Sequence, residues 1–190
     1  MNVSNQQRMI VGLDIGTSKV IYQAEFSKAV DGSNVLGTRD TYLGLAYEGM
    51  GTVKMGIMDS PLKKSQGKFD LFNDVVDIKN VIDGENRFAN SVNYTSEKIG
   101  ALQTSVSYIM MEDATGVADD GISANLTFKQ GDIYAAVAID TKTEDADTSS
   151  FRGTVIYTMG DMRFGALLHN VDSTDTADAE MALAVNASMR

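Results

Sequence analysis

Residues 121–140 read GISANLTFKQGDIYAAVAID, and their pattern indicates a pair of strands. Apolar residues such as Ile122, Leu126 and Phe128 alternate with small or polar residues. This alternation is typical of a β-strand with one apolar face. Gly131 follows at once, and a second apolar segment begins after it. The stretch therefore predicts two antiparallel strands joined by a tight turn.

The same period of two continues over most of the chain after Lys19. No comparable helical stripe interrupts it, so the sequence predicts an all-β fold. Most of the segments are longer than the roughly 5–6 residues usual in soluble proteins, and they approach the ~9–11 residues that cross a bilayer at a tilt. We predict about ten strands, at 19–28, 41–48, 51–59, 90–97, 101–112, 121–130, 132–143, 151–159, 162–172 and 181–190.

Short, Gly-containing turns alternate with longer and mostly acidic connections along this predicted ladder. In an up-and-down sheet, such alternation places every tight turn at one end and every long connection at the other. This sorting is typical of outer-membrane barrels, which have short periplasmic turns and long outer loops. The alternative from the residues alone is a soluble β-sandwich. The tight turns lie at 49–50, 98–100, 131 and 160–161, and the long connections at 29–40, 60–89, 113–120, 144–150 and 173–180.

Composition argues against several classes of function. The 190 residues carry a formal net charge of −10, whereas DNA or RNA binding needs a basic surface. No run approaches the roughly 18 apolar residues of a membrane-spanning helix. There is no Cys, and His169 is the single histidine, so a thiolate zinc site, a Cys nucleophile and a catalytic triad are all disfavoured. We therefore expect a protein that is not an enzyme and that needs no metal or other cofactor.

Five stretches resemble the general diffusion porins of Gram-negative bacteria. A weaker resemblance continues through the later hairpins, so that it covers about 170 residues in all. It begins at the third strand of that family and ends near the twelfth of about sixteen. The five stretches are RDTYLGL at 39–45, GTVKMG at 51–56, DSPLK at 59–63, FDLFND at 69–74 and NSVNY at 90–94, and Arg87 precedes the last.

The resemblance implies an antiparallel, up-and-down transmembrane β-barrel in the outer membrane. Such a barrel encloses a water-filled channel, through which small hydrophilic solutes diffuse passively, and three barrels assemble into a homotrimer. The implied partners are these solutes, membrane lipid and lipopolysaccharide, and no nucleic acid. The chain supplies the central strands of that fold.

The connection at 60–89 carries eight apolar residues, which would be wasteful on a solvated loop. We expect it to pack against another part of the protein and to accommodate a short helix. The resemblance implies a constriction loop inside the barrel, whose acids face a basic wall and help to sort solutes. The ionic selectivity stays open, because Ile57 stands where many relatives have Arg. The implied loop residues are Lys63, Lys64, Lys68, Asp70, Asp74, Asp77 and Arg87, and the candidate basic wall is Arg39, Lys54, Arg152 and Arg163.

Residues 9–20 resemble a different family, the bacterial cell-division actin homologue FtsA. There the corresponding segment is the first phosphate-binding hairpin of an ATPase fold. We divide the chain accordingly into a leader at 1–19, which is not an independent domain, and a porin-like segment at 20–190. An actin-like ATP-binding protein of cell division is thus the alternative function. The implied nucleotide-binding residues are Asp14, Gly16, Thr17, Ser18 and Lys19.

Overall fold

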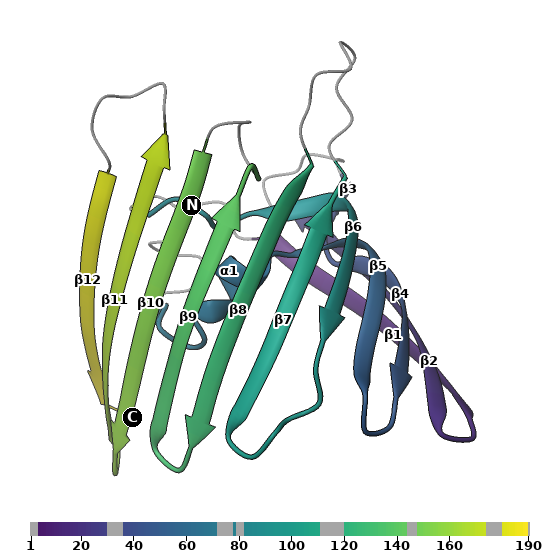
Figure 1. The fold of residues 1–190 in the computed structure, drawn as a ribbon, viewed down its shortest axis with the longest axis horizontal. Coiled ribbons are helices and arrows are strands. Elements are labelled where there is room, and N and C mark those ends of the chain that lie inside the picture. The colour runs from purple at the N-terminus through teal and green to yellow at the C-terminus, as the bar shows by residue number, and fades with distance from the viewer. Residues whose placement is uncertain are drawn as a thin grey trace.

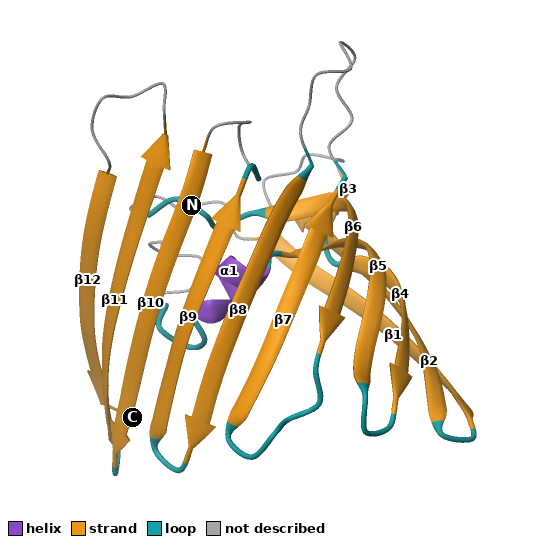
Figure 2. Ribbon diagram, viewed as in Figure 1, coloured by secondary structure: helices purple, strands orange, loops and turns teal. Residues whose placement is uncertain are grey.

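The structure is a single curled antiparallel sheet with a short helix on its concave side (Figures 1 and 2). Eleven strands follow one another across the sheet in chain order, and one short strand pairs beside the second. The all-β prediction is therefore confirmed. The computed structural model describes residues 4–29, 36–71, 78, 82–110, 120–143, 148–173 and 180–189.

Twelve strands and one helix lie in these described ranges. The first six strands are β1 (Ser4–Ile15), β2 (Ser18–Ala29), β3 (Leu36–Thr38), β4 (Thr41–Tyr47), β5 (Gly51–Asp59) and β6 (Arg87–Thr95), and helix α1 (Pro61–Ser65) lies between β5 and β6. The other six are β7 (Leu102–Ile109), β8 (Gly121–Gln130), β9 (Ile133–Thr141), β10 (Thr148–Met159), β11 (Met162–Ser173) and β12 (Glu180–Met189).

All ten predicted strands are present, and their ends shift by three residues at most. The predicted number was nevertheless too low, because β1 and β3 were not foreseen. β1 pairs with β2 over its whole length, from Ser4 opposite Ala29 to Ile15 opposite Ser18. The boundary predicted at residue 19 thus falls inside a hairpin of the sheet.

The tight turns lie at one end of the sheet, and the strand ends that flank the long connections lie at the other, as predicted (Figure 2). The tight turns between β4 and β5, β8 and β9, and β10 and β11 all lie at the lower end in that view, and so does the turn between β1 and β2. Gly131 and Gly160 take φ values of +56° and +58° in two of these turns. Glycine adopts this left-handed conformation without a steric penalty, so both residues suit a two-residue turn.

The two faces of the sheet differ in chemistry. Directly paired residues of neighbouring strands share a face, so rows of them can be followed across the sheet. The outer row is apolar and mostly exposed, and the inner row is small, polar and buried. The outer row is Leu126, Val137, Gly153, Leu168 and Leu183, and the inner row is Asn93, Ser107, Ser123 and Asp140.

The sheet is open between β1 and β12, which form its two edges. Each edge strand pairs on one side only in the described part of the chain, so its other side presents unpaired backbone N–H and C=O groups. Among the described residues, no helix has the length and apolar character needed to span a membrane.

The connection between β5 and β6 returns to the concave side of the sheet, where α1 contacts β7 to β10. The hydroxyl of Ser60 caps the first turn of α1. Leu62 N donates a hydrogen bond to Ser123 Oγ at 3.1 Å, and Asn125 Nδ2 donates to Pro61 O at 2.6 Å. Side chains of β8 thus hold the backbone of the helix against the sheet.

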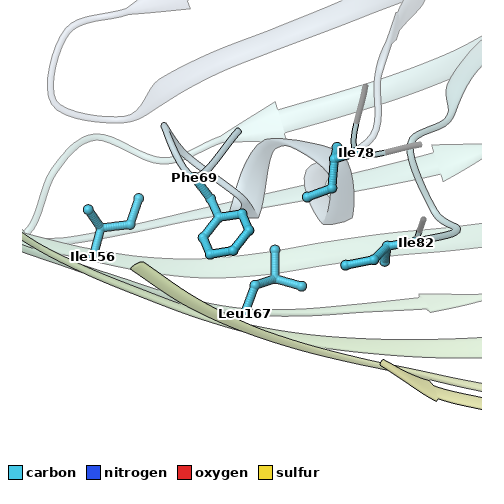
Figure 3. Close-up of a cluster of buried hydrophobic side chains, with 5 residues drawn as sticks. All are labelled: Phe69, Ile78, Ile82, Ile156 and Leu167. Atoms are coloured by element: carbon cyan, nitrogen blue, oxygen red, sulfur yellow. The ribbon is translucent and has the colours of Figure 1, made fainter. Parts of the chain in front are cut away.

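A buried apolar cluster fixes the rest of this connection (Figure 3). Phe69, Ile78 and Ile82 belong to the connection, and they pack against Ile156 of β10 and Leu167 of β11. Full burial of an apolar side chain of this size contributes roughly 1.5–3 kcal/mol. The connection therefore packs against the sheet, as its apolar residues predicted. Four other apolar residues of the connection, Phe72, Val75, Val76 and Val81, lie outside the described residues.

Arg152 of β10 binds the same connection through its guanidinium group. One nitrogen, Nη1, pairs with the Glu85 carboxylate, and Nη2 donates to Asp83 O at 2.6 Å. Nε donates to His169 Nδ1 at 3.4 Å. The side chains of Arg152 and Glu85 are 0% and 6% exposed. A charge so far removed from water needs hydrogen-bonded partners, so this group ties residues 83–85 to the sheet.

The assignment of the two faces predicts the effect of an added charge. Val106, on the outer face of β7, is 41% exposed. We expect Val106→Arg to lower the free energy of unfolding by about 2–4 kcal/mol in lipid vesicles, because it places a charge in the apolar face. Urea unfolding of vesicle-inserted protein measures this loss. Gln103→Arg, on the inner face of the same strand, is the control and should stay within about 0.5 kcal/mol of the parent. Equal losses in the two variants would contradict the assignment.

The Arg152 contacts predict a second loss. Arg152→Met leaves the Glu85 carboxylate buried without its cation, and we expect the free energy of unfolding in detergent micelles to fall by about 3–5 kcal/mol. Arg163→Met is the control, since Arg163 lies on the neighbouring strand and has no ion pair in the described part of the chain. Its expected change is within about 0.5 kcal/mol. Equal stability of the two variants would rule out the tether.

Candidate functional site

Charged side chains gather on the concave side, where the start of α1 meets the end of β5 and the start of β6. They come from β2, β5 and β6, from the segment that precedes β4, and from α1. Most of them are linked by ion pairs, and the others lie within electrostatic reach of the same residues. The charged cluster, as we name it, consists of Glu25, Arg39, Asp40, Lys54, Asp59, Lys63, Lys64 and Arg87.

Arg87 is the centre of one network in the charged cluster. Its Nε lies 2.7 Å from Asp40 Oδ1, and its Nη2 lies 2.8 Å from Asp59 Oδ1. Lys63 Nζ of α1 approaches the same Asp59 oxygen at 3.0 Å. The network therefore joins the end of β5, the start of β6 and the helix of the connection.

A second pair lies beside this network. Arg39 Nε is 2.7 Å from Glu25 Oε1, and Arg39 N donates to Glu25 O at 2.8 Å. Gln23 accepts a hydrogen bond from the Tyr42 hydroxyl at 3.0 Å, and it donates to Asp40 O at 3.4 Å. These bonds hold the segment before β4 against β2.

Lys54 and Lys64 form no ion pair in the described part of the chain. Lys54 Nζ lies 5.0 Å from the centre of the Tyr42 ring, within the range of a cation–π contact. The pKa of Lys64 is lowered from its ordinary value, mainly because the surrounding protein removes the side chain from water. Repulsion by the Lys54 cation is the second cause. The two ammonium groups are thus close enough to repel each other.

The charged cluster has five cations and three carboxylates, an excess of two positive charges when all are ionised. The carboxylates are held in ion pairs, whereas two of the cations are not. Such an arrangement can attract anions from solution to the concave side of the sheet. In the described ranges, the charged cluster included, no three His, Asp or Glu side chains are placed to hold a metal ion.

The described part of the predicted loop places two of its cations in the charged cluster. The resemblance implied acidic side chains on the loop and basic ones on the wall. Lys63 and Lys64, which were also among the implied loop residues, lie on α1, and the nearby sheet contributes Asp59 together with basic side chains. The acids Asp74 and Asp77 of the predicted loop lie outside the described residues.

Arg152 of the predicted basic wall pairs with an acid of the connection. It was a candidate for the basic wall, but the connection covers it completely, and its charge is bound to Glu85. Asp70 is half-buried. Of the other predicted residues, Arg39, Lys54, Lys63, Lys64 and Arg87 belong to the charged cluster, whereas Lys68 and Arg163 line a separate cavity near the tight turns.

Three acids of the charged cluster were not predicted: Glu25, Asp40 and Asp59. A signal for two of them was available, because Asp40 precedes β4 and Asp59 ends β5. These strands form a hairpin, so both residues lie at the end that faces the long connection. Asp59 N donates to Asp40 Oδ1 at 3.2 Å, which reflects that proximity.

The candidate nucleotide-binding residues lie on the β1–β2 hairpin. Asp14 and Lys19 face each other across the two strands, with Lys19 Nζ 3.8 Å from Asp14 Oδ1. The Asp14 side chain is 80% exposed. Gly16 and Thr17 form the tight turn, and Ser18 begins β2. The five residues thus lie at the end of the sheet that carries the tight turns.

Comparison with known proteins identifies relatives of the whole fold. The profile of the family described as Gram-negative porin matches residues 6–190. The major outer membrane protein P.IB of Neisseria gonorrhoeae is 28% identical over 135 residues, which are 66% of this chain and 37% of that protein. The chain therefore spans little more than a third of the length of this curated relative.

Solved structures share the arrangement of strands. Salmonella typhi OmpF, solved in complex with daunomycin, matches with a TM-score of 0.82 and 14% identity, over 100% of this chain and 67% of that one. An anion-selective porin from Comamonas acidovorans matches with a TM-score of 0.78 and 19% identity, over 99% of this chain and 64% of that one. At these identities the likeness concerns the fold alone.

The family match covers nearly the whole chain, including residues 6–19 of the segment that was assigned to a separate leader. The sheet order, the sorted connections and the apolar outer face agree with it. The protein belongs to the Gram-negative porin family of the outer membrane.

Proposed function

We propose that the protein forms a water-filled channel, through which small hydrophilic solutes diffuse passively across the outer membrane. The proposal rests on the position of the β5–β6 connection, which lies on the concave, polar side of the sheet instead of outside it. A segment held there by Arg152 and the apolar cluster occupies part of the cross-section that the sheet surrounds. Passage needs no chemical step, no cofactor and no catalytic residue.

The charged cluster lines the narrow part of this channel in our proposal, and it favours anions. This anion preference is supported by the excess of two cations in the charged cluster. It is also supported by the absence of carboxylate partners for Lys54 and Lys64 in the described part of the chain. Fixed charges act strongly in a narrow aqueous passage between walls of low dielectric constant. Anions are therefore concentrated beside α1, and cations are depleted there.

The assembly that we propose is a homotrimer. A solved OmpT of Vibrio cholerae, described as a trimer form, matches with a TM-score of 0.75 and 15% identity, over 98% of this chain and 64% of that one. The outer face of the sheet exposes large apolar side chains, which fit membrane lipid or a neighbouring barrel. Lipopolysaccharide is the further partner that we propose, through divalent cations at the acidic connections.

We do not propose nucleotide binding by residues 14–19. Asp14 and Lys19 pair with each other, and both side chains are more than half exposed. A phosphate-binding hairpin needs backbone N–H groups that point toward its ligand. Here an antiparallel partner strand pairs with β1 along its entire length.

Planar bilayer recordings test the channel and its selectivity together. We expect refolded protein to give stepwise single-channel currents, and its reversal potential in a KCl gradient to indicate preference for chloride. Lys54→Glu combined with Lys64→Glu converts the excess of two cations into an excess of two carboxylates, so the reversal potential should change sign.

Lys98→Glu is the matched control, because Lys98 is exposed in the turn between β6 and β7, away from the charged cluster. Its reversal potential should keep the sign of the parent. Absence of any current would overturn the channel. Current with equal reversal potentials in the parent and the double variant would overturn the role of the cluster.

A further inference from the structure

A cavity lies at the end of the sheet that carries the tight turns. Its volume is about 430 Å³, and it lies between the turn that follows α1 and the inner face of β8 to β11. The turn-end cavity, as we name it, is lined among others by Gly67, Lys68, Lys129, Asp132, Tyr134 and Arg163. It does not include any member of the charged cluster.

The wall of the turn-end cavity is held in place by close contacts. Tyr134 of β9 donates a hydrogen bond from its hydroxyl to Ser65 O at 3.0 Å. Gly67 takes a φ of +60°, and a Cβ atom there would lie 2.6 Å from Tyr134 Cε1. The turn at Gly67 therefore rests directly on the tyrosine ring. Because Lys68 follows Gly67, its backbone is set at the rim of the cavity.

Charge in the turn-end cavity is mainly positive. Lys68 comes from the connection, Lys129 from β8 and Arg163 from β11, and Asp132 is the one acid among the lining residues. None of the three cations forms an ion pair in the described part of the chain. Lys129 is paired in register with Tyr134, and Arg163 with Thr158, so both basic side chains share the inner face.

Three cations around one cavity repel one another unless an anion lies between them. A guanidinium group offers a planar fork of N–H donors that matches the oxygens of phosphate or carboxylate, and lysine adds a mobile positive charge. The Thr158 hydroxyl lines the same cavity and supplies a further donor. The volume is large enough for a small oxyanion with part of its hydration shell.

We propose that the turn-end cavity is a binding site for small oxyanions such as phosphate. The site belongs to the channel proposed above, and this inference rests on that channel because the channel supplies the solute. Anions concentrated by the charged cluster on one side of α1 meet a second group of cations near the tight turns. The concave side thus offers two groups of cations, one in the charged cluster and one around the turn-end cavity.

Phosphorus NMR of inorganic phosphate tests this site without any need for ion conduction. Refolded protein in detergent micelles is titrated with phosphate, and the line width of the phosphate signal is followed. We expect saturable broadening by the parent protein. Lys129→Gln combined with Arg163→Gln should weaken the apparent affinity by at least about tenfold, because each charge-assisted hydrogen bond contributes strongly to anion binding.

Lys98→Gln is the matched control, since it removes a cation from the neighbouring turn outside the cavity, and it should leave the affinity unchanged. The urea midpoint of each variant reports whether it is folded, and single variants at Lys129 and Arg163 replace the double variant if that fails to refold.

Equal affinity in folded parent and variant protein, or an equal loss in the Lys98→Gln control, would overturn the site. Conductance with no phosphate binding overturns this inference alone, whereas phosphate binding without conductance overturns the channel proposed above.

Discussion

The buried guanidinium group of Arg152 determines where the β5–β6 connection can lie. An ion of this kind loses several kcal/mol of hydration when it leaves water, and hydrogen-bonded partners must compensate for that loss. Glu85, Asp83 and His169 occupy its donor groups, and the ion pair joins residues 67 positions apart in the chain. Ser60 N also donates to Asn86 O at 3.1 Å, which brings the two ends of the connection together. The connection is therefore closed on itself and fixed to β10.

The inner face of the sheet is built to receive this connection. Small polar residues such as Ser107 and Ser123 leave room for α1, and they supply hydrogen bonds in place of bulk. At Gly165, a Cβ atom would lie 2.9 Å from Phe69 Cδ2, so a larger residue would push the ring away. Asn186 of β12 donates to Phe69 O and holds the same segment. The charged cluster and the turn-end cavity lie on either side of this packed region, so their separation follows from it.

Much of the sheet could be predicted from the sequence, because the alternation of apolar and polar residues is a local signal. β5 and β8 have the predicted limits. β1 was missed although Met9, Val11 and Leu13 alternate on its outer face. Ile10 lies between them on the inner face and turns the pattern into a continuous apolar run, which resembled the strand of a phosphate-binding hairpin.

The position of the β5–β6 connection could not be predicted from such a local signal. The sequence indicated that the segment packs against something, but the burial of Arg152 depends on contacts with residues far away in the chain. The acids of the charged cluster depend likewise on which strand ends face α1.

A double-mutant cycle between Arg152 and Glu85 tests the central claim most directly. The free energy of unfolding in detergent micelles is measured for the parent, Arg152→Met, Glu85→Leu and the double variant. If the two side chains form a buried pair, the losses are strongly non-additive, with a coupling energy of about 1.5 kcal/mol or more, and the double variant recovers much of the stability lost by Arg152→Met. If the connection lies away from β10, the two losses add to within about 0.5 kcal/mol, and that result would contradict the account.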